Sequence, residues 1–256
     1  MHTLNKKEFN TTGWIILAQV VAASTGFLIL MSVFEIPDIL RMTAEYRFSL
    51  FVEKKSIIIP VYYLLALTGI SQIIISVLIF LTFKEKSTIL ILGAIFGILC
   101  GTFQAMGFIR WSILIPYIAE FQDVSPQIIA FVESAFNRYA GMAIGEHLGF
   151  LMQSAWTICL GLAMQKSQLF SKGLGVIGVW IGVLSFFMSL EPLGGHFGIF
   201  GELTNPVETA WYIWLVFIAT TLFKSQSDSI KAIKFGWISL SIGFASWLVF
   251  VIPAYL

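Results

Sequence analysis

The segment from Thr88 to Ile109 reads TILILGAIFGILCGTFQAMGFI and contains no charged residue. A helix needs about 20 apolar residues to cross the hydrocarbon core of a bilayer, so this segment is long enough to span a membrane. Other stretches of similar or slightly shorter length make up most of the 256-residue chain. The seven predicted spans are Gly13 to Phe34, Ile57 to Phe83, Thr88 to Ile109, Tyr139 to Met164, Gly173 to Leu190, Pro206 to Phe223 and Phe235 to Tyr255.

The composition excludes an ordinary soluble protein. Hydrophobic residues make up 58% of the chain and charged residues only 11%, whereas soluble domains have roughly a quarter charged residues. The net charge of +1 and the scattered lysines give no basis for nucleic-acid binding. We therefore expect residues 1–256 to form a single integral membrane domain in contact with the lipid bilayer. Cys100 and Cys159 both lie inside predicted spans, where we expect packing rather than a disulfide.

The distribution of lysine predicts the orientation. The N-terminus and the loops after spans two, four and six lie on one side of the membrane, side A, and the other loops lie on side B. Most lysines fall on side A and most acidic residues on side B. Because positively charged loops remain in the cytoplasm, side A is predicted to be inside. The predicted fold is an all-α, polytopic transmembrane bundle of about seven spans with its N-terminus inside and its C-terminus outside.

Two series of glycines, each spaced four residues apart, indicate that spans three and four touch. Small residues at this spacing allow two membrane helices to approach closely and to gain dispersion contacts. The two series are Gly93, Gly97 and Gly101, and Gly141, Gly145 and Gly149.

Two side B segments are too patterned to be plain linkers. In residues 37–53, apolar and charged residues alternate, which predicts an amphipathic helix on the outer membrane surface or a cap over the mouth of the bundle. Residues 191–207 are rich in glycine and proline and contain no lysine or arginine, so we expect an irregular outer loop that could form a lid. The polar candidates from this region are Glu191, His196, Glu202, Asn205 and Glu208.

Glu146 is the deepest acidic residue in the predicted spans. At about 100° per residue, Tyr139, Glu146 and Gln153 share a helix face, whereas His147 points elsewhere. A buried carboxylate needs a cation or stays protonated, and the candidate partners are Arg110, Gln104 and Arg138. The predicted ligand or proton site therefore comprises Glu146, His147, Gln104, Arg110, Arg138, Tyr139 and Gln153. The same residues are also consistent with purely structural bonds between helices.

Catalytic and metal-binding patterns are weak. His196 with Glu202 or Glu208 could bind a metal, with His147 completing the set, but no HxxxH, HExxH or CxxC spacing occurs. We assign no catalytic residue, no metal site and no cofactor. We therefore favour a non-enzymatic protein over an enzyme.

Four runs carry a resemblance to a known family: FEIPDILR, FQAMGFIRWSILIPYIA, FNRYAGMAIGEHLGFLMQSAWT and SKGLGVIGVWIGVLSF. Over roughly residues 33–215 the chain resembles uncharacterised bacterial multi-pass membrane proteins with domain of unknown function 4386. The stretches around Arg110 and Glu146 are the most specific parts. The resemblance implies a helical protein of the plasma (inner) membrane, and it implies no substrate, cofactor or catalytic residue.

Three functional hypotheses follow. The first is that the protein binds or passes a small solute or a proton through an outward-facing polar cavity. The second is an intramembrane enzyme or a haem or metal protein that uses His147 and His196. The third is a non-catalytic membrane assembly subunit. The sequence indicates neither the ligand nor the oligomeric state.

Overall fold

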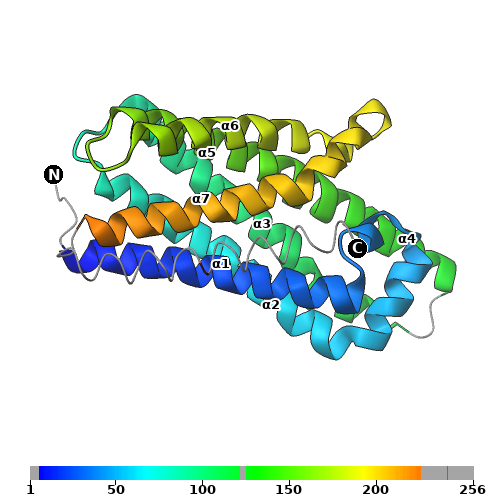
Figure 1. Ribbon diagram of the computed structural model, residues 1–256. Helices are drawn as coiled ribbons and strands as arrows, with labels where there is room; N and C mark the ends of the chain where they lie inside the picture. Colours follow the sequence, from blue (N-terminus) through cyan, green and yellow to red (C-terminus); the bar gives the residue numbers. More distant parts are fainter. Residues whose placement is uncertain (1–5, 122–124, 226–240, 242–256) are drawn as a thin grey trace.

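Long helices make up nearly all of the computed structural model, which describes residues 6–121, 125–225 and 241 (Figure 1). Six helical stretches among these residues are long and apolar enough to cross a membrane. They correspond to the first six predicted spans, and the seventh, Phe235 to Tyr255, lies outside the described residues except for residue 241. In chain order the elements are α1 (Lys6–Phe34), η1 (Asp38–Arg41), α2 (Ala44–Thr82), α3 (Thr88–Ile118), α4 (Pro126–Phe136), η2 (Asn137–Leu148), α5 (Gly149–Lys166), α6 (Lys172–Met188), η3 (Glu191–Leu193), η4 (Gly195–Leu203) and α7 (Thr204–Lys224).

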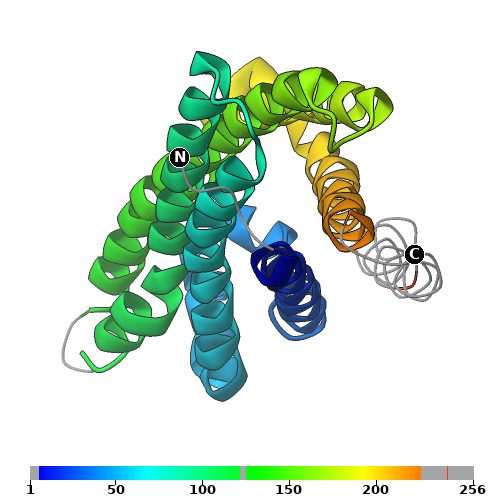
Figure 2. The ribbon, with the colours of Figure 1, turned by 90° about the vertical axis from the view of Figure 1, so that its left-hand side faces the viewer.

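The six long helices are arranged as a ring. α1 packs against α2, α2 against α3, α3 against α5, α5 against α6 and α6 against α7, and α7 returns to α1. Figure 2 shows the bundle from the end at which α1 begins. Successive helices run in opposite directions, so the loops of side A lie at one end and those of side B at the other (Figure 1).

Hydroxyl side chains define where several helices begin. Ser87 accepts a hydrogen bond from the Leu90 amide at the start of α3, and Ser171 does the same for Leu174 at the start of α6. Each hydroxyl satisfies an amide that has no carbonyl partner within its own helix. These caps lie at the side A end and separate the lysine-bearing loops from the apolar spans.

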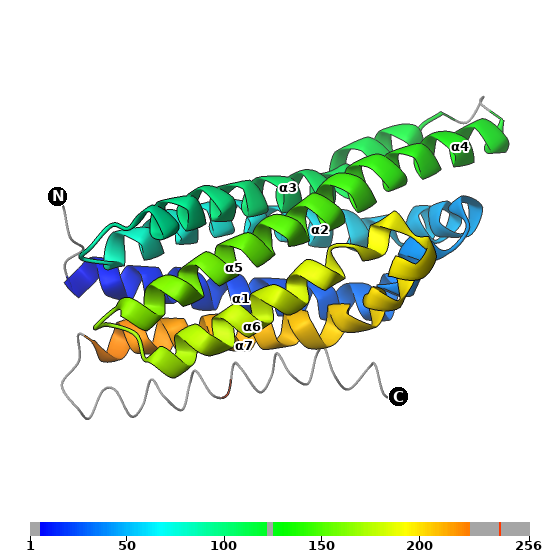
Figure 3. The same ribbon diagram turned by 90° about the horizontal axis from the view of Figure 1, so that it is seen from above.

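Two spans have about twice the length that a membrane requires. α2 has 39 residues, or about 58 Å at 1.5 Å per residue, whereas the hydrocarbon core is about 30 Å thick. The helical run Pro126–Lys166 has 41 residues. Figure 3 shows that α4 and the start of α2 extend past the ends of α6 and α7. We call this extension the head; it comprises residues 38–60, 108–118 and 126–136.

The head corrects one prediction from the sequence. Residues 37–53 do not form a separate helix: 38–41 are a short 3-10 helix, and 44–53 are the first turns of α2. Thr43 caps α2 by accepting from the Tyr46 amide, so the helix begins well before the predicted start of the span. Pro60 lies inside α2, and the light blue part of the helix runs at an angle to the rest (Figure 1). A proline removes a helical hydrogen bond and commonly bends a helix at that point.

The head and the adjoining ends of α1, α2 and α3 share an apolar core built around Trp111, which is fully buried. Tyr62 stacks on its ring with centroids 5.4 Å apart, and Phe34 meets the ring edge-on at 4.9 Å. A second core joins α1, α2, α3, α5, α6 and α7 and contains Trp156, Trp211 and Trp214. The bundle therefore has two apolar cores, one of which extends into the head.

Glycines bring α3 into contact with the fourth span, as predicted, but in a different register. A Cβ atom on Gly107 would lie only 2.7 Å from the Cα of Gly145, so these two backbones meet directly. Gly93 faces Cys159 of α5. Gly97 lies against Ser76 of α2 and Trp156 of α5, and Gly101 faces Gly69 of α2. The three-residue series on α3 therefore serves two neighbouring helices, and Gly107, outside the series, is the glycine of α3 that meets the backbone of η2.

Residues 191–207 are more regular than expected from the sequence. They form the 3-10 helices η3 and η4 and the first turn of α7. Gly194 and Gly195, between the two 3-10 helices, have φ angles of 76° and 58°. Side chains disfavour this conformation, so glycine is suited to the turn. No residue of η4 is buried.

Candidate functional site

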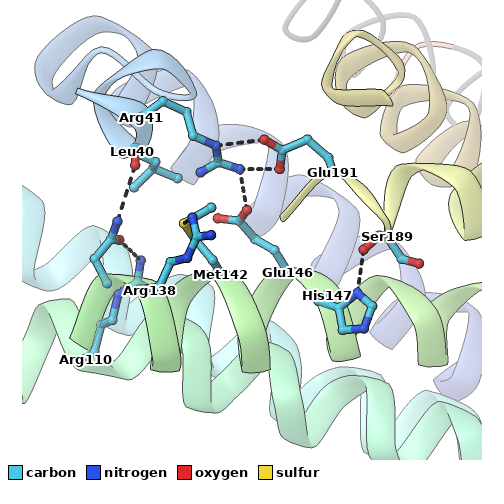
Figure 4. Close-up of polar contacts among 10 residues, drawn as sticks. Leu40, Arg41, Arg110, Arg138, Met142, Glu146, His147, Ser189 and Glu191 are labelled. Carbon is cyan, nitrogen blue, oxygen red and sulfur yellow. Dashed lines mark hydrogen bonds and ion pairs between the residues drawn. The ribbon is translucent and has the colours of Figure 1, made fainter. Parts of the chain in front are cut away.

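A cluster of charged residues joins three side B segments. Arg41 of η1 donates from Nη2 to Glu146 of η2 at 2.6 Å, and from Nε and Nη2 to Glu191 of η3 at 2.9 and 2.5 Å. Figure 4 shows the guanidinium between the two carboxylates. We call this arrangement the Arg41 clasp. It ties together segments that are far apart in the sequence.

The clasp is only partly shielded from solvent. The side chain of Arg41 is 39% exposed, and those of Glu146 and Glu191 are 20% and 17% exposed. Burial lowers the pKa of Arg41, but the hydrogen bonds and charges of Glu191 and Glu146 outweigh it, so the pKa is raised above its usual value. The guanidinium therefore stays charged at any physiological pH.

The clasp corrects the expected partner of Glu146. Within the described residues, Glu146 is bonded to Arg41 and not to Arg110, Gln104 or Arg138. Sequence reasoning missed Arg41 because the partner lies in a connecting segment before α2. The sequence did show that Arg41 lies between two predicted spans, on the same side of the membrane as Glu146. It could not show that the two side chains are close enough to form an ion pair.

Arg110 forms a separate group and is buried. It donates through Nη1 to the Gly107 carbonyl and through Nη2 to Asn137 Oδ1, the latter at 3.0 Å. Asn137 Nδ2 in turn donates to the Leu40 carbonyl at 3.3 Å. Arg110 thus fastens α3 to η2 and, through Asn137, to η1. Its Nε has no partner within the described structure.

Gln104 and Gln153 belong to a third group inside the ring. Gln104 Nε2 donates to Gln153 Oε1 at 3.0 Å, and Gln153 Nε2 donates to Glu208 Oε1 at 2.5 Å. Gln153 is fully buried. This row of side chains crosses from α3 through α5 to α7 and places Glu208 with the glutamines rather than in the outer loop.

Helix η2 changes which residues share a face. Residues 137–148 form a π-helix, in which hydrogen bonds run from residue i to i+5 and each turn holds more residues than in an α-helix. Arg138, Met142 and His147, at spacings of four and five, consequently line one cavity. The predicted pairing of Tyr139 with Glu146 on one face is wrong, because it assumed α-helical rotation. Tyr139 lines the cavity with His147, and Glu146 reaches Arg41.

The cavity has a volume of about 320 Å³ and lies between η2 and η3. Most of its wall is apolar, and its polar side chains come from Arg138, Tyr139 and His147. The lining residues are Ala135, Arg138, Tyr139, Met142, Ala143, His147, Pro192 and Leu193.

His147 is oriented by the segment across the cavity. Its Nδ1 lies 2.6 Å from the carbonyl oxygen of Ser189 (Figure 4). A carbonyl can only accept, so Nδ1 carries the proton and donates. In the neutral imidazole Nε2 is then left as an acceptor.

The remaining outer-loop candidates are not assembled into this site. His196 and Glu202 are exposed in η4, and the carbonyl of Asn205 accepts from the Thr209 hydroxyl at 2.8 Å. Across the described ranges, no group of three or more His, Cys, Asp and Glu residues is arranged to hold a metal ion. Both cysteines are free.

Another ion pair, not predicted from the sequence, lies inside the head. Arg47 of α2 donates from Nε and Nη2 to the two carboxylate oxygens of Glu133 in α4, at 2.7 and 2.6 Å. The side chains are 3% and 0% exposed. Arg47 Nη1 also donates to the Met42 carbonyl at 2.9 Å, so the pair fixes α4 and the turn after η1 on α2.

Six apolar helices of membrane-spanning length define a multi-pass membrane protein. The chain belongs to the family described as "Domain of unknown function (DUF4386)", whose model matches residues 11–219. The resemblance seen in the sequence is thereby confirmed. No curated protein and no solved structure matches the chain.

Proposed function

We propose that this protein binds a small solute in the cavity between η2 and η3, at the outward-facing end of a bundle in the plasma membrane. The observation that carries the proposal is a cavity of about 320 Å³ whose largely apolar wall contains only a few polar side chains, notably Arg138 and His147. Apolar walls with a few placed polar groups are typical of small-molecule sites. The π-helix that forms one wall is a rare conformation that occurs frequently at functional sites.

The outward orientation rests on the charge bias of the loops. It can be tested by introducing single cysteines at Lys84 on side A and Glu120 on side B, after replacing Cys100 and Cys159 by alanine. A membrane-impermeant thiol reagent added to intact cells should label the Glu120→Cys variant alone. Labelling of Lys84→Cys alone would reverse the orientation.

Solute binding can be tested with three probes of equal length: octanoate, octanol and octylamine. Each is added to the protein in nanodiscs of phosphatidylcholine, and the melting temperature is measured. A solute that binds only the folded state at ten times its Kd stabilises that state by about 1.4 kcal/mol. We expect at least one probe to raise the melting temperature.

The matched variants place the effect in the cavity. Ala143→Trp fills part of the cavity and should abolish the rise in melting temperature. Ile177→Trp, at an exposed position on α6 away from the cavity lining, should leave it intact. If no probe has an effect, or if both variants respond like the parent, the cavity is not a binding site.

A proton site is a second candidate, supported by the row Gln104, Gln153 and Glu208. The carboxyl of Glu208 accepts a hydrogen bond from Gln153 and lies within α7, where a charge is costly in a membrane. If it exchanges a proton during function, Glu208→Gln should abolish the pH dependence of any transport or host phenotype while the melting temperature is kept. An unchanged pH dependence would exclude this role.

A further inference from the structure

Arg138 differs from the other three arginines in its partners. Arg41 is bound by two carboxylates, Arg47 is paired with Glu133, and Arg110 is buried against carbonyl and amide oxygens. Arg138 is exposed, and within the part of the chain that the structure describes its Nη1 donates to the sulfur of Met142, at 3.8 Å. A thioether is a weak acceptor, so the guanidinium keeps most of its capacity for hydrogen bonding.

The cavity around Arg138 has no acidic residue in its wall. The two nearby segments each contribute one carboxylate, Glu146 and Glu191, and the Arg41 clasp binds both of them. Arg41 thus holds both carboxylates and offsets one of their two negative charges, and Arg138 is the charged side chain that lines the cavity. The remaining wall offers methyl and methylene groups, chiefly from Met142, Ala143 and Leu193.

The rim of the cavity is apolar and open to the surroundings of the bundle. Tyr139 is 66% exposed and Leu193 is 54% exposed, and both line the cavity. Outside the cavity lining, Tyr117 of α3 and Phe131 of α4 carry exposed rings in the head, at 58% and 74%. Aromatic side chains of this kind concentrate where a bilayer meets water. A molecule could therefore enter from the lipid and headgroup region with its polar end at this boundary.

We propose that the ligand of this cavity is an anionic amphiphile, a molecule with one carboxylate or phosphate head bound by Arg138 and an apolar chain against Met142, Ala143 and Leu193. Guanidinium binds such heads through two parallel hydrogen bonds. His147 also lines the cavity, and in its neutral form Nε2 can accept a hydrogen bond from the hydroxyl of a monoprotonated phosphate head. The inference rests on the proposed function, since it requires that the cavity bind a solute.

The test compares affinities for charged and uncharged probes. Protein in phosphatidylcholine nanodiscs carries a fluorescent reporter on Ser134→Cys, next to the lining residue Ala135, with Cys100 and Cys159 replaced by alanine. Octanoate, octanol and octylamine are titrated separately. We expect octanoate to bind most tightly and Arg138→Gln to weaken it about tenfold or more. Arg138→Lys should restore most of the affinity for octanoate.

Lys55→Gln is the matched control. Lys55 is an exposed cation at the same end of the bundle, outside the cavity, and its loss should leave the affinity for octanoate unchanged. A fall in affinity equal to that of Arg138→Gln would mean that the surface charge of the head, and not the cavity, attracts the anion. That result would overturn the proposal.

The remaining outcomes separate the two proposals. Equal binding of octanoate and octanol, with no effect of Arg138→Gln, overturns the anionic class but leaves solute binding standing. Tighter binding of octylamine than of octanoate would also overturn the anionic class and leave solute binding standing. Absence of binding by all three probes, with Ala143→Trp behaving like the parent, overturns both.

A final comparison identifies the source of the anion. Part of the phosphatidylcholine in the nanodiscs is replaced by phosphatidylglycerol, whose phosphodiester head is anionic. If a bilayer lipid is the ligand, the reporter should already show the bound signal and octanoate should compete weakly. If the ligand is a free acid, octanoate should bind as it does in phosphatidylcholine. Either result supports an anionic amphiphile and assigns its source.

Discussion

Arg47 and Arg41 lie close together in the sequence and at the same end of the bundle, yet their surroundings are opposite. Arg47 and Glu133 are almost completely buried, and one guanidinium meets one carboxylate through two hydrogen bonds. Arg41 is partly exposed and shared between two carboxylates. The first pair is balanced in charge, whereas the second carries one excess negative charge.

This difference separates a structural contact from one that can respond to its surroundings. A buried pair cannot open without leaving a charge in an apolar environment, which is costly. A partly exposed cluster is solvated and screened when it opens, so opening costs little. The buried pair holds the head together, and the clasp holds η3 on η2 beside the candidate cavity.

The largest effect should follow from breaking the buried pair. Glu133→Leu leaves the guanidinium of Arg47 with carbonyl oxygens only, and we expect it to lower stability by about 3–5 kcal/mol. Calorimetric unfolding in detergent provides the measurement. The double variant Arg47→Met with Glu133→Leu should recover most of the loss, because no charge stays unpaired. If Glu133→Leu melted like the parent, the head would not depend on this pair.

An intermediate loss of stability is expected from disrupting the contact between Gly107 of α3 and Gly145 of η2. Gly145→Leu would drive a side chain into the backbone of Gly107 and should cost about 1–3 kcal/mol through overpacking. Gly173, whose added Cβ would meet nothing within 4 Å, is the control. Gly173→Leu should keep or slightly raise the melting temperature, since leucine favours a helix. Equal losses for both variants would argue against close packing at Gly145.

A smaller effect is expected from opening the clasp. Arg41→Gln should cost about 1 kcal/mol, since a partly exposed ion pair contributes little and the two carboxylates then repel each other. The pKa of Arg41 is raised, so its stabilisation is fully present below its ordinary pKa and is lost only as the pH rises through the raised pKa. The guanidinium is charged at both about pH 7 and pH 9. The melting temperatures of the parent and Arg41→Gln should therefore differ by the same amount at the two pH values. A difference that vanished at the higher pH would contradict this assignment.

The smallest effect should come from an ordinary surface pair. Lys54 contacts Glu53 at 2.6 Å, with side chains 42% and 64% exposed. Lys54→Ala should change stability by less than about 0.5 kcal/mol. Thermal unfolding of Lys54→Ala and Arg41→Gln under the same conditions would show whether loss of the clasp costs more stability than loss of this surface pair. If the two variants were equal, the clasp would be no more than a surface contact.

Much of the fold could be predicted because its cause is local in the sequence. A run such as Thr88 to Ile109 can satisfy its backbone in a membrane only as a helix, whatever its neighbours are. Glycine spacing also predicted that the third and fourth spans touch. The register could not be predicted, since Gly107 and Gly101 are chemically identical and only the tilt of α3 decides which one meets Gly145.

The candidate site was predicted in its parts but not in its grouping. Sequence reasoning selected Glu146, His147 and Arg138 as unusual residues for a membrane helix, and all three lie at or beside the cavity. It named Arg110, Gln104 and Arg138 as candidate partners of Glu146 but not Arg41, and it expected one polar cavity. The structure divides the candidates among the clasp, the Arg110 group, the glutamine row and the cavity.

By itself, the sequence determined the membrane class, the helical fold and the residues that membrane burial makes unusual, because each follows from the hydrophobicity and charge of short stretches. Only the tertiary structure decided which of these residues meet. Arg41 reaches Glu146 and Glu191 because the ring of helices brings η1, η2 and η3 to one end of the bundle. His147 and Arg138 share a cavity because η2 is wound as a π-helix, and hydrophobic periodicity read at the α-helical angle could not reveal this.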